Sequence, residues 1–327
     1  MKAAFLIAAM LIVPAAAAQK KVDRPKVHAD FYFGSIPPAP EAAAALSKDK
    51  ARLVMVGYHE GWSESKMAKE LGLTTREIDG IHTELMDLGL LGRYRGDFVP
   101  AVLVVRDRDI EELQSALDRD VRDFAVVVQA GMRDIETLLS SFSGGKDVPM
   151  DERLYAAMVG GVLFSGMVEV FADDKTFLPA PPAHGKSEFY GWLVEGDRDW
   201  AGKIQRDSWD SESYQLVSVG DSLLEQKPSL DDVRRSGFVL EEVEARRFRS
   251  YAVVLARDKL LPFFKSQRDD LLKAHRKVDS GRYSAFKTFF AWYYTMLVNR
   301  TVDRLVMSKI LTPPSTPYVY ALKMPVR

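Results

Sequence analysis

An apolar stripe runs through the middle of this chain for 34 residues, from Asp109 to Phe142, and indicates one very long helix. Its members recur at spacings of three and four: Ile110, Leu113, Leu117, Val121, Phe124, Val128, Met132, Ile135 and Leu139. Such spacing places them on one helix face, and at 1.5 Å per residue the helix would reach about 50 Å. A helix of that length outreaches a small domain, so a second domain or the same helix of another subunit is expected to cover the stripe. The second alternative predicts a homodimer.

The N-terminus has the pattern of a secretory signal peptide. Met1-Lys2 gives a short positive start, an apolar run covers residues 3–13, and four alanines precede Gln19. A signal peptidase requires small residues at that place, so we predict cleavage after Ala18 and a periplasmic or secreted mature protein. The apolar run is shorter than the ~20 residues that cross a bilayer. A retained N-terminal anchor is the alternative.

The composition is that of an ordinary globular protein. Hydrophobic residues make up 47% of the chain and charged residues 28%, with a formal net charge of −1. This charge creates no global basic field that would attract nucleic acid or anionic lipid. The chain has no cysteine, which excludes disulfides and thiolate metal sites. We predict no membrane span after the N-terminal segment, because the most apolar later run, residues 156–171, is short and carries Glu169.

The segment before the long stripe has signals for three helices and a hairpin. Residues 41–58 are rich in Ala and Leu and predict the first helix. Ser63 is placed to cap a second helix, and Thr74 with Glu77 has the spacing of a capping box at the start of a third. A Gly-Asp turn then separates two alternating runs and predicts a β-hairpin over residues 90–105.

Residues 51–105 resemble the winged helix-turn-helix domains of MarR- and ArsR-type regulators. The matching residues are Met67-Ala68-Lys69-Glu70-Leu71-Gly72-Leu73-Thr74 and the segment from Ile78 through Leu91, with the hairpin as the wing. The resemblance implies that the third helix and the wing form the contact face, and it favours a dimer. The candidate residues for contact with a partner or with DNA are Thr75, Arg76, Asp79, Thr83, Arg93 and Arg95.

The charge of that contact face argues against DNA binding. Between Thr75 and Leu88 one cation, Arg76, stands against four carboxylates, and an acidic helix does not fit among phosphates. Together with export, this charge favours a binding or scaffolding protein of the cell envelope that uses a winged helix to contact a protein partner. A DNA-binding protein, either a transcriptional regulator or an exported DNA binder, is the alternative.

The predicted fold class is α+β, with an N-terminal winged helix, a long connecting helix and a second, mixed α+β domain. The expected segments are a signal peptide (1–18), a tether or packed arm (19–40), the winged helix domain (41–108), the long helix (109–142) and the α+β domain (150–327). In the last of these we expect helices at 151–172, 258–278 and 284–310, a short helix after Ser229, and strands at 189–195, 214–219, 249–255 and 318–322.

Aromatic residues form a second candidate site between residues 188 and 214. The candidate ligand-binding residues are Tyr190, Trp192, Trp200, Trp209 and Tyr214, interleaved with carboxylates. Such a cluster can bind a carbohydrate or a cation, and paired carboxylates would make an exported hydrolase the second alternative function. The same residue types are typical of the core of a sheet. No motif for a nucleophile, a metal or a nucleotide is complete, so we assign no catalytic residue, metal or cofactor and favour a non-enzymatic role.

Overall fold

The computed structural model describes residues 30–220, 224, 226–314 and 318–324. The predicted signal peptide and most of the predicted tether lie outside these residues. The fold is α+β. Its first half consists of β1 (Phe31–Ile36), α1 (Pro40–Leu46), α2 (Asp49–His59), α3 (Glu64–Leu71), α4 (Thr75–Asp87), β2 (Leu91–Tyr94), β3 (Asp97–Pro100), β4 (Leu103–Val105) and the long helix α5 (Asp107–Ser140).

The second half alternates helices with short strands. It consists of α6 (Met150–Tyr155), the π-helix η1 (Ala156–Gly166), α7 (Met167–Asp174), β5 (Ala183–His184), β6 (Ser187–Glu188), β7 (Tyr190–Glu195), the 3₁₀ turn η2 (Arg198–Ala201), β8 (Gln205–Ser211), β9 (Tyr214–Gly220), α8 (Leu230–Ser236), β10 (Val239–Leu240), α9 (Glu242–Leu255), the π-helix η3 (Ala256–Leu260), α10 (Leu261–Lys277), the 3₁₀ turn η4 (Asp279–Arg282), α11 (Phe286–Met307) and β11 (Tyr318–Lys323).

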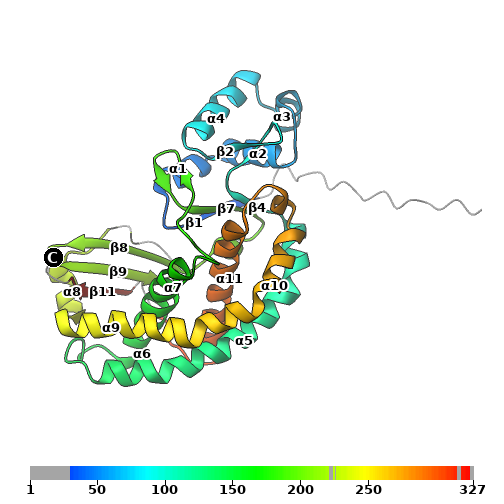
Figure 1. The fold of residues 1–327 in the computed structure, drawn as a ribbon. Coiled ribbons are helices and arrows are strands. Elements are labelled where there is room, and N and C mark those ends of the chain that lie inside the picture. The colour runs from blue at the N-terminus through cyan, green and yellow to red at the C-terminus, as the bar shows by residue number, and fades with distance from the viewer. Residues whose placement is uncertain (1–29, 221–223, 225, 315–317, 325–327) are drawn as a thin grey trace, which may run out of the picture.

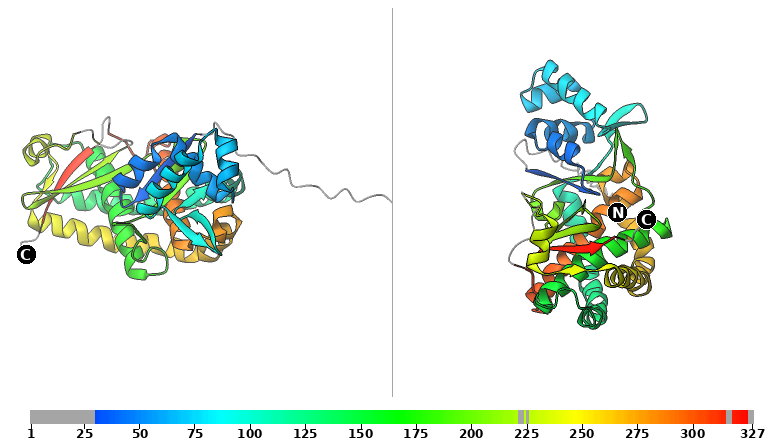
Figure 2. Two further views of the ribbon diagram at one scale, coloured as in Figure 1. Left: turned by 90° about the horizontal axis from the view of Figure 1, so that it is seen from above. Right: turned by 90° about the vertical axis from the view of Figure 1, so that its left-hand side faces the viewer.

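A three-stranded sheet joins the N-terminal helices to the rest of the chain (Figure 1). Its central strand, β7, pairs antiparallel with β1 and parallel with β4. Alternate residues of β7 face opposite sides: Leu193 packs with helices α1–α4, whereas Trp192 and Val194 pack with the helical body. The right-hand view of Figure 2 shows the N-terminal helices on one side of this sheet and the body on the other. The described part of the predicted tether therefore includes a strand that packs on the body.

Helix α5 includes almost all residues of the predicted apolar stripe. It packs against α6, α10 and α11 of the same chain, and Leu117 and Phe124 are fully buried there. The apolar stripe is therefore covered within one chain. The homodimer remains a prediction, but this stripe no longer supplies a physical reason for it.

A second sheet has the strand order β10-β11-β9-β8. One face packs against α8 through Leu216 and Ala321, and the other packs against η1 through Val217 and Tyr320. The continuous helix Met150–Asp174 contains η1 and lies in the core. Among the described helices it alone is long and apolar enough to cross a membrane, but most of it is buried in the protein, as a core helix would be.

Three local predictions differ from the structure. Residues 249–255 form the end of helix α9, not a strand, because Phe248, Ala252 and Leu255 pack on the core at helical spacing. The predicted first helix is two helices, α1 and α2, separated at Ser47 and Lys48. Strand β4 does not extend the hairpin, because it pairs with β7 instead.

Candidate functional site

The helix pair α3–α4 is held by the local caps that the sequence predicts. The Ser63 hydroxyl accepts a hydrogen bond from the Lys66 amide at 3.3 Å, and Gly72 ends α3 in a left-handed conformation. At the start of α4, the Glu77 amide donates to Thr74 Oγ1 at 3.2 Å, and the Thr74 amide donates to Glu77 Oε2 at 2.9 Å. Both predicted caps are confirmed, so the role of Ser63 is structural.

The β2–β3 hairpin packs on α4 through His82. His82 Nδ1 and the Tyr58 hydroxyl share a hydrogen bond at 2.7 Å, and the His82 ring meets the Phe98 ring edge-on at 4.5 Å between centroids. These contacts place the hairpin beside α4. The predicted contact residues of the helix and of the hairpin therefore lie on adjacent parts of the surface. Thr75, Arg76, Asp79, Thr83, Arg93 and Arg95 are all exposed.

Neighbouring lysines offset the acidity of α4. Lys50 Nζ lies 2.8 Å from Glu77 Oε1, and Lys48 Nζ lies 2.6 Å from Glu84 Oε1. The hydrogen bond from Lys50 is the largest cause that lowers the pKa of Glu77, to about 2. The contact face, defined as α4, the β2–β3 hairpin and these two lysines, carries five cations and five carboxylates. They are Lys48, Lys50, Arg76, Arg93 and Arg95, and Glu77, Asp79, Glu84, Asp87 and Asp97.

The arginines of the hairpin rest on neighbouring aromatic rings. The Arg93 guanidinium carbon lies 4.3 Å from the centre of the Phe98 ring, and that of Arg95 lies 5.2 Å from the centre of the Tyr94 ring. Because five carboxylates share the contact face with these cations, the two arginines make only a weak phosphate-binding surface.

A groove of about 530 Å³ opens between α1 and α4, on one side of the contact face. Ala44, Ala45, Gly80 and Leu88 supply small or apolar surface, and the other lining residues are Glu41, Lys48, Thr83, Glu84 and Asp87. A Cβ atom at Gly80 would meet no atom within 4 Å, so the groove is open there. No sequence pattern indicates this groove, because α1 and α4 are distant in the chain.

The body fixes the position of α4 through the β5–β6 hairpin. His184 Nδ1 lies 2.9 Å from the carbonyl oxygen of Gly89, directly after α4. Gly89 has a φ of +65°, and a Cβ atom there would collide with the backbone of Gly185. The β5–β6 hairpin thus fixes the C-terminal end of α4, and with it the position of the contact face relative to the body.

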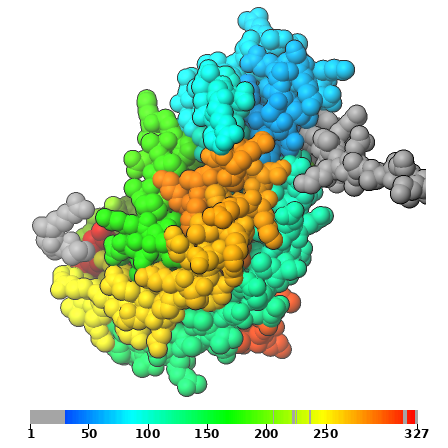
Figure 3. All heavy atoms as spheres, turned by 45° about the vertical axis from the view of Figure 1, so that its right-hand side comes forward, coloured from blue at the N-terminus to red at the C-terminus, as the bar shows by residue number. Residues whose placement is uncertain are grey.

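A network of buried charges connects the N-terminal helices to the body. Arg106, directly before α5, donates from Nε to Glu195 Oε2 at 2.6 Å and from Nη1 to Glu60 at the end of α2. His59 Nδ1 shares a hydrogen bond of 2.7 Å with the Tyr283 hydroxyl, next to α11. In Figure 3 the orange α10–α11 connection lies directly against the blue N-terminal helices. This contact is therefore polar as well as apolar.

Burial changes the pKa of two groups in this network. The pKa of His59, whose side chain is 1% exposed, is lowered to about 3, mainly by burial and in smaller part by the charges of Arg106 and Arg282. Burial raises the pKa of Asp109 to about 6, against the opposing effect of its hydrogen bond from the Arg106 amide. His59 is therefore neutral at neutral pH.

The predicted aromatic cluster belongs to the core. Tyr190, Trp192, Trp200 and Tyr214 are each 9% exposed or less, and Trp209 is partly buried. The indole of Trp192 donates to the Ala201 carbonyl at 3.0 Å, and the Tyr190 hydroxyl donates to the Pro179 carbonyl. Tyr190, Trp192 and Tyr214 pack inside the protein because β7 and β9 are central strands. Four of the five rings are thus closed to a ligand.

Within the described ranges, no group of three or more His, Cys, Asp or Glu side chains is arranged to hold a metal ion. Comparisons with protein families, with curated proteins and with solved structures find no match to this chain.

Proposed function

We propose that this is an exported binding or scaffolding protein of the periplasm or envelope, which uses a winged helix as a protein-contact module. The module consists of α2–α4 and the β2–β3 hairpin, and its partner meets the contact face. The observation that carries the proposal is the charge of that exposed face, where cations and carboxylates are equal in number. Binding to DNA depends on an excess of cations, whereas a balanced polar surface beside an apolar groove suits a protein partner.

The groove between α1 and α4 defines the chemistry of that partner. Glu84 is already paired with Lys48, but among the described residues Glu41 and Asp87 have no ion-pair partner. A partner segment with small apolar side chains would pack along Ala44 and Gly80, and its cations would meet the two free carboxylates.

The test uses the mature chain as bait in the native envelope fraction. Gly80→Arg fills the groove with a long cationic side chain, and since Gly80 has open space and Arg favours helices more than Gly, α4 stays folded. Gln129→Arg makes a matched change at an exposed position of α5. We expect a protein that wild type and Gln129→Arg retain and that Gly80→Arg loses. Identical captured proteins for all three baits would refute a partner in this groove.

Export itself is tested on natively expressed protein. The proposal expects a mature chain that begins at Gln19 and fractionates with the periplasm or the medium. A chain that keeps Met1 and stays in the cytosol would instead support the regulator alternative.

A further inference from the structure

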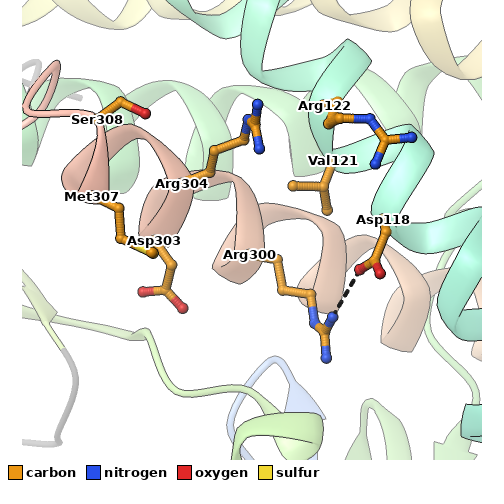
Figure 4. Close-up of a pocket in the computed structure, with 8 residues that line it drawn as sticks. All are labelled: Asp118, Val121, Arg122, Arg300, Asp303, Arg304, Met307 and Ser308. Atoms are coloured by element: carbon orange, nitrogen blue, oxygen red, sulfur yellow. Dashed lines mark hydrogen bonds and ion pairs between the residues drawn. The ribbon is translucent and has the colours of Figure 1, made fainter.

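We propose that a groove between α5 and α11, on elements separate from the contact face, binds a phosphate group. The groove has a volume of about 540 Å³ and is lined by three arginines, Arg122 from α5 and Arg300 and Arg304 from α11 (Figure 4). Val121 and Met307 supply apolar surface beside them. The guanidinium groups of Arg122 and Arg304 project from the two facing helices on one side, whereas that of Arg300 turns the other way, toward Asp118 (Figure 4), so the first two are the donors for an anion.

Arg300 is already held in a single orientation. Its guanidinium carbon lies 4.0 Å from the centre of the Trp200 ring, and Nη1 lies 3.1 Å from Asp118 Oδ1. Trp200 is itself fixed, because its carbonyl accepts a hydrogen bond of 3.0 Å from the buried Trp292 indole. Arg300 therefore neutralises Asp118 and forms one end of the groove, and the ligand is left to the other two arginines.

Arg122 and Arg304 are available for a ligand. Figure 4 shows their side chains leaving the two facing helices on either side of Val121. Over the part of the chain that the structure describes, neither guanidinium has an ion-pair or hydrogen-bond partner. Both side chains are exposed, so a ligand in the groove can reach them without a change of fold.

The carboxylates of the groove do not cancel this charge. Asp118 is paired with Arg300, and desolvation is the largest cause that raises the pKa of Asp303. Two unpaired guanidinium groups then remain against one carboxylate that is less acidic than usual. The groove has a net positive charge, although the whole chain does not.

The groove chemistry fits a phosphate better than a carboxylate. A tetrahedral phosphate presents several oxygens to donors that approach from different directions, and a guanidinium can bind two of them. Met307 is 84% exposed and Ile310, just beyond α11, is 36% exposed. These apolar side chains could contact the hydrocarbon part of a ligand, so the phosphate can belong to a lipid headgroup or to a soluble phosphate ester.

Two assays distinguish these sources. Inorganic phosphate is added during thermal unfolding, with chloride at equal ionic strength as reference, because a ligand that binds the folded state raises the Tm. Flotation compares vesicles of phosphatidylglycerol with vesicles of phosphatidylcholine. The variant is Arg122→Gln with Arg304→Gln, and the control is Arg133→Gln, an exposed arginine of α5 outside the groove.

We expect the double variant to bind at least about tenfold more weakly, the factor for the loss of one charge-assisted hydrogen bond, and the control to bind as wild type does. A phosphate-dependent rise in Tm that the double variant loses shows a soluble ligand, and selective flotation with phosphatidylglycerol that it loses shows a lipid. The proposal fails if neither assay shows binding, or if the double variant binds as well as wild type. Both substitutions are at exposed positions, so equal Tm values without phosphate would show that the variant is folded.

Discussion

Arg106 and Glu195 form a buried ion pair, with Arg106 Nε 2.6 Å from Glu195 Oε2, although 89 residues separate them in the sequence. The two side chains are 7% and 5% exposed. Arg106 lies between β4 and α5, and Glu195 ends β7, so the pair closes the edge of the sheet that joins the N-terminal helices to the body. Its main effect is to fix the position of the N-terminal helices relative to the body.

Loss of Arg106 should destabilise the protein strongly. Arg106→Met leaves Glu195 buried without its cation, and such a loss costs about 3–5 kcal/mol. Arg106→Met combined with Glu195→Met removes both charges and should cost less than Arg106→Met alone. Urea unfolding measures the difference, with the exposed Glu136→Ala as control, expected within about 0.5 kcal/mol of wild type. A double variant less stable than Arg106→Met would show that the unpaired charge of Glu195 is not the main cause of the stability lost in Arg106→Met.

His59 should make the protein less stable in acid. Its folded pKa, about 3, lies below the ordinary value of 6.5. The unfolded chain therefore binds more protons between these values, and stability falls as the pH falls through this window, by at most about 1.4 kcal/mol per pH unit. His59→Gln cannot be protonated, so its unfolding free energy should depend less on pH between about pH 4 and pH 7. Parallel pH profiles for wild type and His59→Gln would contradict this assignment.

Asp109 should make the protein more stable in acid, opposite to the effect of His59. Burial raises its pKa from 3.8 to about 6, so its contribution to stability is complete below pH 3.8 and is lost as the pH rises through 6. Asp109→Asn removes this gain on acidification. We therefore expect its stability to fall more steeply than that of wild type as the pH is lowered, in the same urea series. A shallower fall would mean that hydrogen bonds to Asp109, and not its desolvation, dominate.

Gly89→Ala should cost more stability than Gly72→Ala. The two glycines have almost the same φ, +65° and +64°, so an alanine in the left-handed conformation costs the same free energy at both positions. A Cβ atom at Gly72 meets open space, whereas one at Gly89 collides with the backbone of Gly185. We expect about 1 kcal/mol for Gly72→Ala, and a further 1–3 kcal/mol, roughly the cost of overpacking, for Gly89→Ala. Equal losses in thermal unfolding would show that the β5–β6 hairpin does not press on α4.

Leu117→Asp should unfold the chain, and should not separate a dimer into folded subunits. Leu117 is fully buried among helices of its own chain, so a carboxylate there would be desolvated without a partner. The expected cost is several kcal/mol. Ser115→Asp, at an exposed position two residues earlier, is the control. Circular dichroism and light scattering decide between the outcomes; a folded monomeric variant from a dimeric wild type would restore the interface predicted from the stripe.

The protein should bind duplex DNA only weakly. The contact face has no excess of cations, so we expect dissociation constants no tighter than about 10⁻⁴–10⁻⁶ M at physiological salt, the range of non-specific binding. Fluorescence anisotropy with random and genomic duplexes measures this. Nanomolar affinity that Arg93→Gln and Arg95→Gln abolish would establish the hairpin as a DNA-binding wing.

Some features of the fold could be predicted from short stretches of sequence. The caps at Ser63 and Thr74 are confirmed, because each depends on hydrogen bonds to residues three positions away. Helix α5 is confirmed because its apolar period persists for many turns. The strand predicted at 249–255 is wrong, because a short apolar run such as Ala252 to Leu255 does not show which neighbour will bury it, and here α9 packs on the core at helical spacing.

The sites depended on contacts between distant segments. From sequence alone, α4 is acidic; in the structure, Lys48 and Lys50 from another helix neutralise part of that charge. The aromatic residues between 190 and 214 have the composition of a ligand site, but four of them are buried by strands and helices that the sequence did not place.

The sequence by itself determined the long helix α5, the helices α3 and α4 with the caps at Ser63 and Thr74, the strands β7 and β9 and the α+β class, since all of these follow from the order of neighbouring residues. Only the tertiary structure decided that β7 lies between β1 and β4, that α5 is covered within its own chain, and that Arg122, Arg300 and Arg304 share a groove. The physical reason is that backbone hydrogen bonds and side-chain period act over a few residues, whereas burial and electrostatic pairing depend on which distant surfaces meet.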